Sequence, residues 1–181
     1  MSQPPSILSL SKVESEEHIS PTTSISIIKV LNEVLSSLNK RNMTKNHKII
    51  IKDRRKQTSR GFDLFIGNNE EIYEVFFNLI ENAIKYSNLN SNINVNISLR
   101  TNGFFQIDII NRGEGISIEN IDRVTERFYR VDKARSRKIG GTGLGLAIVK
   151  HILIKHKGKL KIFSELNNKT IFSVLLPSIK Q

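Results

Sequence analysis

The spacing of apolar and polar residues along the chain predicts an alternation of helices and strands. Apolar residues recur with a helical period in the longer segments and alternate with polar residues in the shorter ones. The expected helices cover residues 6–17, 24–45, 69–87 and 144–156, with a short one near 118–124. The expected strands cover residues 48–52, 62–66, 93–100, 104–110, 159–164 and 170–176.

The order of these elements indicates the fold class. Helices come first, mixed strands and helices follow, and a strand pair closes the chain. Asn102 and Gly103 form a typical tight-turn pair, which predicts a hairpin between the two strands beside them. Asn68 or Asn69 is suited to cap the helix that follows. We therefore predict an α+β protein, a two-layer α/β sandwich with a mixed sheet and helices on one face.

Composition limits the class of protein and its location more than it limits the chemistry. The chain has 181 residues, 38% of them hydrophobic, which suffices for one domain with a real core. Cysteine is absent, so disulfides and thiolate metal sites are excluded. Neither a membrane-spanning apolar run nor a signal peptide is evident, so we expect a cytoplasmic location. The net charge of +11 does not predict nucleic-acid binding, because no nucleic-acid motif accompanies it.

One face of the helix expected at 69–87 carries candidate chemistry. Asn78, Asn82 and Lys85 fall at positions i, i+4 and i+7, and Glu81 lies at the edge of that face. Amide oxygens suit Mg²⁺, which needs only one or two protein ligands when phosphates supply others. The alternative is a solvated helix face with a Glu81–Lys85 pair. Other residues of this helix are expected to point toward the core: Leu79, Ala83 and Tyr86.

Glycines precede the helix expected at 144–156. Four of them stand at Gly140, Gly141, Gly143 and Gly145, and they leave backbone N–H groups free at a helix start, where phosphate binds well. The alternative is a flexible hinge before a packed helix. A second glycine pair lies in residues 111–115, NRGEG, at the end of a strand. It would let the backbone approach a flat ligand closely, or simply form a turn.

Four of these segments, in this order, resemble the motifs of one protein family. NLIENAIKYS (78–87) resembles the N box, and NRGEGI (111–116) resembles the first glycine box. TERFYR (125–130) resembles the F box, and GGTGLGLAIVK (140–150) resembles the second glycine box. The family is the ATP-binding catalytic domain of sensor histidine kinases, in the GHKL ATPase superfamily. The resemblance covers about residues 24–177 and is strongest to phosphate-regulon sensor kinases.

The resemblance implies a Bergerat-type ATP-binding fold with bound ATP and Mg²⁺. Asn82, with Asn78 beside it, would bind Mg²⁺, and residues 118–142 would form a lid over ATP. The implied catalytic residues are Glu81, Lys85, Arg130, Arg135 and Arg137. The implied nucleotide-binding residues are Asn78, Asn82, Lys85, Tyr86, Asn111, Gly113, Gly115, Ile116, Gly141, Thr142, Gly143, Leu144, Gly145 and Thr170. Hydrolytic relatives have a glutamate where Asn78 stands, so its absence favours transfer to a protein over hydrolysis.

Two departures from the family pattern stand out. Where the family usually has an aspartate that accepts a hydrogen bond from adenine, this chain has Asn111. Loss of the charge predicts ATP binding weakened by several-fold to about tenfold. None of the four histidines stands in the H-[ED]-L-[RK]-x-P setting of the phosphoacceptor. We therefore expect the accepting histidine on a separate or missing segment.

The implied function is a kinase domain of a two-component system, which transfers the γ-phosphate of ATP to a histidine for relay to a response regulator. Residues 1–20 would be a remnant of the second helix of the dimerisation hairpin, and residues 21–181 the catalytic domain. Expected partners are a histidine-bearing dimerisation domain and a receiver domain, with a membrane contacted only through a missing sensor region. The alternatives are a decoy module that binds nucleotide weakly and a serine kinase of the anti-sigma type.

Overall fold

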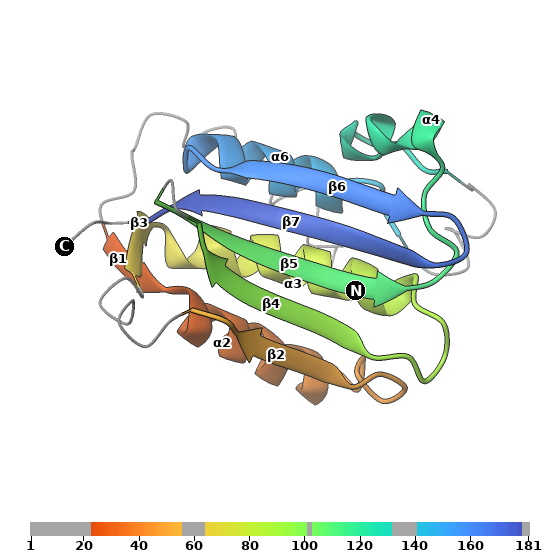
Figure 1. The fold of residues 1–181 in the computed structure, drawn as a ribbon, viewed down its shortest axis with the longest axis horizontal. Coiled ribbons are helices and arrows are strands. Elements are labelled where there is room, and N and C mark those ends of the chain that lie inside the picture. The colour runs from red at the N-terminus through yellow and green to blue at the C-terminus, as the bar shows by residue number, and fades with distance from the viewer. Residues whose placement is uncertain (1–22, 56–63, 101–102, 132–140, 179–181) are drawn as a thin grey trace, which may run out of the picture.

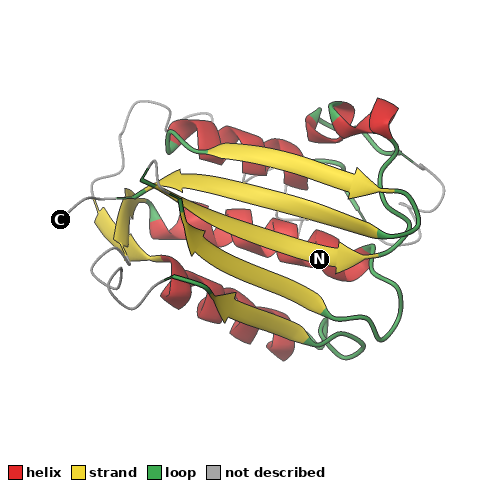
Figure 2. Cartoon of the chain, viewed as in Figure 1, coloured by secondary structure: helices red, strands yellow, loops and turns green. Residues whose placement is uncertain are grey.

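The computed structural model describes residues 23–55, 64–100, 103–131 and 141–178. A five-stranded sheet forms one layer and helices cover one of its faces (Figures 1 and 2). The strands, in spatial order, are β2 (Ile49–Asp53), β4 (Ile93–Leu99), β5 (Phe104–Arg112), β7 (Lys169–Pro177) and β6 (Lys159–Glu165). Strand β2 runs parallel to β4, and the other neighbours are antiparallel. The predicted two-layer α+β class with a mixed sheet is confirmed.

The helical layer consists of α2 (Ile27–Lys40), α3 (Asn69–Lys85) and α6 (Gly145–Lys155). Each of them buries one apolar stripe, as the spacing of three and four residues requires. Strands β4 and β5 alternate between buried and partly exposed residues, so one face of the sheet packs on these helices. The largest fully buried side chains lie between the layers: Phe65, Phe76, Phe105, Ile27, Leu31, Leu38, Ile72, Leu79, Ile80, Ile93, Ile97 and Ile107.

Helix α3 begins where the sequence predicts. The side chain of Asn68 accepts a hydrogen bond of 3.1 Å from the backbone N–H of Glu71, which is a regular N-cap. Glu70 and Glu71 stand in the first turn and Lys85 in the last, where each charge complements the helix dipole. The cap and the charges fix the start of the helix that carries the amide residues.

The helix predicted at 24–45 is wrong at both ends. Residues Thr23–Ser26 form strand β1, which pairs antiparallel with β3 (Leu64–Gly67), and Ile25 lies opposite Phe65. This small sheet buries both of those side chains, so a partner some forty residues away overrides the local helical pattern. The helix ends at Lys40, and a turn follows in which Asn42 takes a φ of 55°.

Most other boundaries agree with the prediction to within about two residues. The short helix expected near 118–124 is instead a helical turn, α4 (Ile118–Ile121), followed by the 3₁₀ turn η2 (Arg123–Thr125). The helix expected at 6–17 and the turn residues 101–102 lie outside the described residues. Within the described part of the chain, no helix is long and apolar enough to cross a membrane.

Candidate functional site

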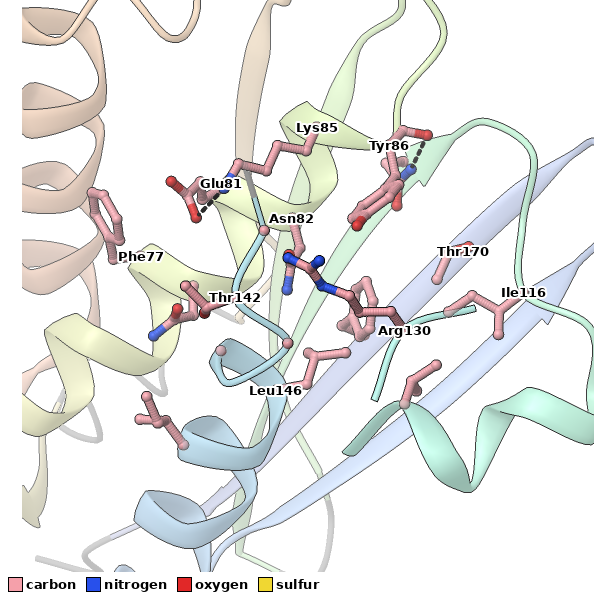
Figure 3. A pocket seen from close by; sticks show the side chains of 18 of the residues that line it. Phe77, Glu81, Asn82, Lys85, Tyr86, Ile116, Arg130, Thr142, Leu146 and Thr170 are labelled. Carbon is pink, nitrogen blue, oxygen red and sulfur yellow. Dashed lines mark hydrogen bonds and ion pairs between the residues drawn. The ribbon is translucent and has the colours of Figure 1, made fainter. Parts of the chain in front are cut away.

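A pocket of about 630 Å³ opens between α3, the start of α6, the ends of β5 and β7, and the segment that follows α4. Figure 3 shows the side chains that line it. Most of the sequence-predicted residues lie on this pocket: Asn78, Glu81, Asn82, Lys85, Tyr86, Asn111, Gly115, Ile116, Arg130, Gly141, Thr142, Gly143, Gly145 and Thr170. Segments that are far apart in the sequence thus form one hollow of the size that binds small molecules.

The predicted face of α3 forms one wall of the pocket. Lys85 Nζ lies 2.9 Å from Glu81 Oε2, so the expected ion pair is present (Figure 3). The amide nitrogen of Asn78 donates a hydrogen bond of 2.9 Å to the backbone carbonyl of Glu74. The amide of Asn82 has no hydrogen-bond partner among the described residues. The face lines a cavity and also contains the ion pair that the alternative named.

The glycine segment packs tightly against its neighbours before α6 begins. Gly143 has a φ of +73°, which favours glycine, and its carbonyl accepts a hydrogen bond of 2.9 Å from Phe128 N–H. A Cβ added at Gly145 would lie 2.8 Å from Asn78 Oδ1, so the glycine allows α6 to start directly against α3. Leu144 does not line the pocket, because its side chain is buried in the core. The described part of this segment is held by close contacts with Phe128 and Asn78, and its use as a phosphate site stays a prediction.

The far end of the pocket is apolar with a small polar floor. Asn111 and Thr170 are cross-strand partners of β5 and β7, and only 3% and 5% of their surfaces are exposed. Thr170 Oγ1 lies 2.8 Å from the hydroxyl oxygen of Ser164. Ile116 lines the same end and lies near Thr170, well away from Phe77 and Glu81 (Figure 3). A flat, mostly apolar ring with polar edges fits such a slot.

Tyr86 corrects one prediction made from helical spacing. It was expected to point toward the core, yet 41% of its surface is exposed and it borders the pocket. The reason is that α3 ends at Lys85, so Tyr86 no longer follows the phase of the helix. Leu79 and Ala83, which lie inside the helix, are buried as predicted.

The glycines of residues 111–115 contact the chain itself. A Cβ on Gly113 would lie 2.0 Å from the carbonyl oxygen of Tyr86, and one on Gly115 would lie 2.5 Å from that of Glu165. Gly113 does not line the pocket, so its contact with a nucleotide stays a prediction. These glycines let neighbouring backbone segments approach closely, and Gly115 also lines the pocket.

The lid region is described in part. Arg130 lies in the middle of the pocket (Figure 3), whereas Arg135 and Arg137 lie outside the described residues. Sequence reasoning missed the wall beyond Phe77. There the ring of Tyr73 stacks on that of Phe77 at 5.9 Å, and the guanidinium of Arg41 lies 5.0 Å from the Phe77 ring. The i, i+4 spacing of the two aromatic residues on α3 was the available signal.

A metal would have to be bound by amide oxygens and by a ligand. Among the described residues, no group of three or more histidine, aspartate or glutamate side chains is placed to bind an ion. Asn78 and Asn82 nevertheless supply neutral oxygens on the pocket wall, and Mg²⁺ commonly takes few protein ligands beside phosphates. The donor set therefore fits Mg²⁺ that arrives with a phosphorylated molecule.

Residues 67–180 match the family described as histidine kinase-, DNA gyrase B-, and HSP90-like ATPase. The chain belongs to this family. The resemblance drawn from the four motifs is thereby confirmed, and with it the expectation of a nucleotide-binding domain.

Curated relatives of the chain are sensor kinases. The chain is 33% identical over 177 residues to the sensor-like histidine kinase SenX3 of Mycobacterium tuberculosis. The aligned part is 96% of this chain and 40% of SenX3. The chain is 40% identical over 114 residues to the phosphate regulon sensor protein PhoR of Haemophilus influenzae. The aligned part is 63% of this chain and 27% of PhoR. WalK of Staphylococcus aureus is 34% identical over 174 residues, covering 94% and 40%. The chain thus spans well under half the length of these relatives.

Solved structures share the fold. The mycobacterial sensor histidine kinase MprB superimposes with a TM-score of 0.73 at 22% identity, covering 88% of this chain and 99% of that one. The catalytic domain of histidine kinase ThkA gives a TM-score of 0.70 at 21% identity. The match covers 86% of this chain and 94% of the ThkA domain. The architecture is therefore that of histidine kinase catalytic domains.

Proposed function

We propose that this chain is the ATP-binding catalytic domain of a two-component sensor histidine kinase. It transfers the γ-phosphate of ATP to a histidine on a separate or missing segment, for relay to a response regulator. The observation that carries the proposal is the single pocket lined by the amide face of α3, the glycine-led start of α6 and the buried floor at Asn111. The sensor kinases among its relatives favour this function over a decoy module or an anti-sigma serine kinase.

The two ends of the pocket suit the two ends of ATP. Lys85 and Arg130 provide positive charge, and Gly141, Gly143 and Gly145 provide backbone near a helix N-terminus, so this end would hold the phosphates. Glu81 would orient Lys85 through their ion pair. The base would lie at the other end. Full-length ShkA, whose fold matches this chain with a TM-score of 0.79 at 18% identity, was solved in complex with AMPPNP.

At the base end, Ile116 and Tyr86 would border the ring of the base while Asn111 and Thr170 meet its polar edge. Thr142 would contact ATP from the glycine segment. Mg²⁺, when bound, neutralises phosphate charge during phosphoryl transfer. Asn82 would be its main protein ligand with Asn78 beside it, and positioning then accounts for most of the remaining catalysis.

Residues 1–20 would be the remnant of a dimerisation hairpin, residues 21–181 the catalytic domain, and both would lie in the cytoplasm. Partners would be a histidine-bearing dimerisation domain and a receiver domain. Arg135 and Arg137 would act on the γ-phosphate or the acceptor domain.

Calorimetric binding of a non-hydrolysable ATP analogue, with and without Mg²⁺, tests the proposal. The wild type is expected to bind in a magnesium-dependent way, and Asn82→Ala to lose at least about tenfold in affinity with Mg²⁺ present. Asn32→Ala is a matched control, because Asn32 is an exposed asparagine on α2. The proposal fails if the wild type does not bind, or if Asn82→Ala binds as tightly as the control.

Phosphoryl transfer needs its own measurement. The chain mixed with Mg·ATP and a dimerisation domain that carries a phosphoacceptor histidine is expected to place acid-labile phosphate on that domain. The isolated chain is expected to carry none. Acid-labile phosphate on the isolated chain would contradict the expectation that the acceptor lies elsewhere.

A further inference from the structure

We infer that the floor of the pocket accepts 6-oxopurine nucleotides as well as 6-aminopurine nucleotides, because Asn111 can reverse its amide. The inference rests on the proposed function, since it requires a nucleotide base at this end of the pocket. It concerns which nucleoside triphosphates the chain binds, and it assigns that choice to one side chain.

Asn111 is a buried polar group on the floor of the pocket. It is 3% exposed, lines the pocket, and lies on the inward face of β5 with Phe105, Ile107 and Ile109. Its amide nitrogen donates a long hydrogen bond of 3.5 Å to the backbone carbonyl of Tyr86. This bond orients the amide, so the oxygen is the atom presented on the other side. An amide oxygen accepts a hydrogen bond, which suits the exocyclic amino group of adenine.

The amide also has a second orientation that a carboxylate lacks. Rotation by half a turn exchanges the NH₂ group and the oxygen of Asn111, and the NH₂ group then donates to a 6-oxo group of a purine. The change gives up the bond to the Tyr86 carbonyl, which at 3.5 Å is at the limit of hydrogen-bond geometry, and it turns the amide oxygen toward that carbonyl oxygen. The loss of one weak neutral hydrogen bond, with two acceptors left facing each other, corresponds to about a tenfold preference for the amino base.

The neighbouring hydroxyl groups can adapt in the same way. Ser164 Oγ accepts a hydrogen bond of 2.8 Å from Ile116 N–H, and its proton has two possible acceptors. It donates either to the carbonyl of Lys169 at 3.2 Å or to Thr170 Oγ1 at 2.8 Å. In the first state Thr170 donates to Ser164, and in the second state the Thr170 hydroxyl proton is available to the pocket. The two neutral polar side chains on the floor, Asn111 and Thr170, can therefore act as donors or acceptors.

Inosine 5′-triphosphate is the direct probe, because it carries the 6-oxo group without the 2-amino group of guanine. Calorimetry would measure Mg·ATP and Mg·ITP on the full chain, on Asn111→Asp and on Asn32→Ala as the matched asparagine control. The wild type and the control are expected to bind ITP within about tenfold of ATP. Asn111→Asp is expected to raise the ratio of the two dissociation constants to about a hundredfold or more, since a carboxylate only accepts hydrogen bonds.

The ratio separates this inference from the proposed function. Binding of ATP with a wild-type preference over ITP of a hundredfold or more overturns the inference alone. An unchanged ratio in Asn111→Asp, with circular dichroism showing a folded variant, also overturns it. If Asn111→Asp fails to fold, Asn111→Ser is measured instead. A serine hydroxyl both donates and accepts hydrogen bonds, so the ratio of the two dissociation constants should stay within about tenfold. A larger ratio contradicts the inference. Absence of binding by either nucleotide overturns the proposed function, and the inference with it.

Discussion

Helices α3 and α6 meet at two polar clusters. The two clusters differ in whether the chain itself supplies the hydrogen-bond and ion-pair partners of their side chains. The closed cluster lies at the start of α3 and the end of α6 and consists of Asn68, Glu71, Lys155 and His156. The open cluster lies farther along α3 and consists of Asn78, Glu81, Asn82 and Lys85, beside the start of α6. Both contain asparagine, glutamate and lysine, and the first contains a histidine besides, but it is the second that lines the pocket.

The closed cluster satisfies nearly all of its groups internally. Lys155 Nζ lies 2.7 Å from Glu71 Oε1, and Asn68 N–H donates to His156 Nε2 at 3.0 Å. The other ring nitrogen of His156 lies 2.9 Å from the carbonyl of Ile152, so this nitrogen carries the proton and donates. Only Glu71 Oε2 is buried without a hydrogen bond. Such a network holds two helices together and offers nothing to a ligand.

The open cluster leaves polar groups facing the hollow. The ion pair of Glu81 and Lys85 retains about a fifth of its side-chain exposure, and Asn82 presents its amide to the pocket. Burial and charge alone therefore do not mark a functional residue. What distinguishes the two clusters is whether the chain itself supplies the hydrogen-bonding partner, and that difference predicts opposite effects of substitution.

The largest effect is expected from the closed cluster, in Glu71→Ala. Removing this carboxylate leaves the largely buried ammonium group of Lys155 without its ion pair, which should lower the free energy of unfolding by about 3 kcal/mol. Urea denaturation measures the loss. Glu126→Ala is the control, because the pair of Glu126 with Arg123 is more than half exposed and should contribute under about 1 kcal/mol.

Nucleotide affinity of the folded Glu71→Ala protein should stay near the wild-type value. If this variant kept full stability but lost binding, the closed cluster would be part of the site and the comparison would fail.

The open cluster predicts the reverse pattern for Lys85→Met. Loss of a charged contact to phosphate should weaken binding of an ATP analogue by about 10- to 100-fold, measured by calorimetry. The free energy of unfolding should change by under about 1 kcal/mol, because only a partly exposed helical pair is lost. Lys29→Met, on the exposed side of α2, is the matched control. Equal binding by the two variants would show that Lys85 does not meet the phosphates.

Sequence reasoning found the open cluster but missed the closed one, and the cause is physical. Helical periodicity connects residues three or four positions apart, so it placed Asn78, Asn82 and Lys85 on one face. The partners Glu71 and Lys155 are 84 residues apart, and no local pattern relates them. Strand β1 was missed in the same way, because its partner β3 lies far along the chain.

The glycines also show that a sequence pattern does not identify non-local contacts. Their low tolerance for a side chain was correctly read as a sign of close approach. What approaches Gly113 and Gly115, however, is backbone from Tyr86 and from Glu165, which only the folded chain brings near. Tyr86 was misplaced because the end of α3 was expected two residues too late. Local chemistry was predictable here, and non-local contacts were not.

The smallest expected effect is a dependence of stability on pH that comes from the closed cluster. Burial of His156 lowers its pKa from the ordinary value, and nearby Lys155 acts in the same direction. The hydrogen bond to the Ile152 carbonyl and the charge of Glu71 oppose this without reversing it. Protonation would also place a hydrogen on the ring nitrogen that accepts from Asn68. The folded protein therefore binds this proton at lower pH than the unfolded chain does.

Stability should consequently be lost as pH falls. The unfolded chain takes up its histidine proton near pH 6.5, whereas folded His156 takes it up only below that, so the unfolded state binds more protons between the two values. The free energy of unfolding, measured in urea, should decrease from pH 7.5 to pH 5.5. His156→Gln retains an acceptor for Asn68 without a titrating proton, so its decrease should be smaller than that of the wild type. An equal decrease in both proteins would mean that the closed cluster does not sense pH.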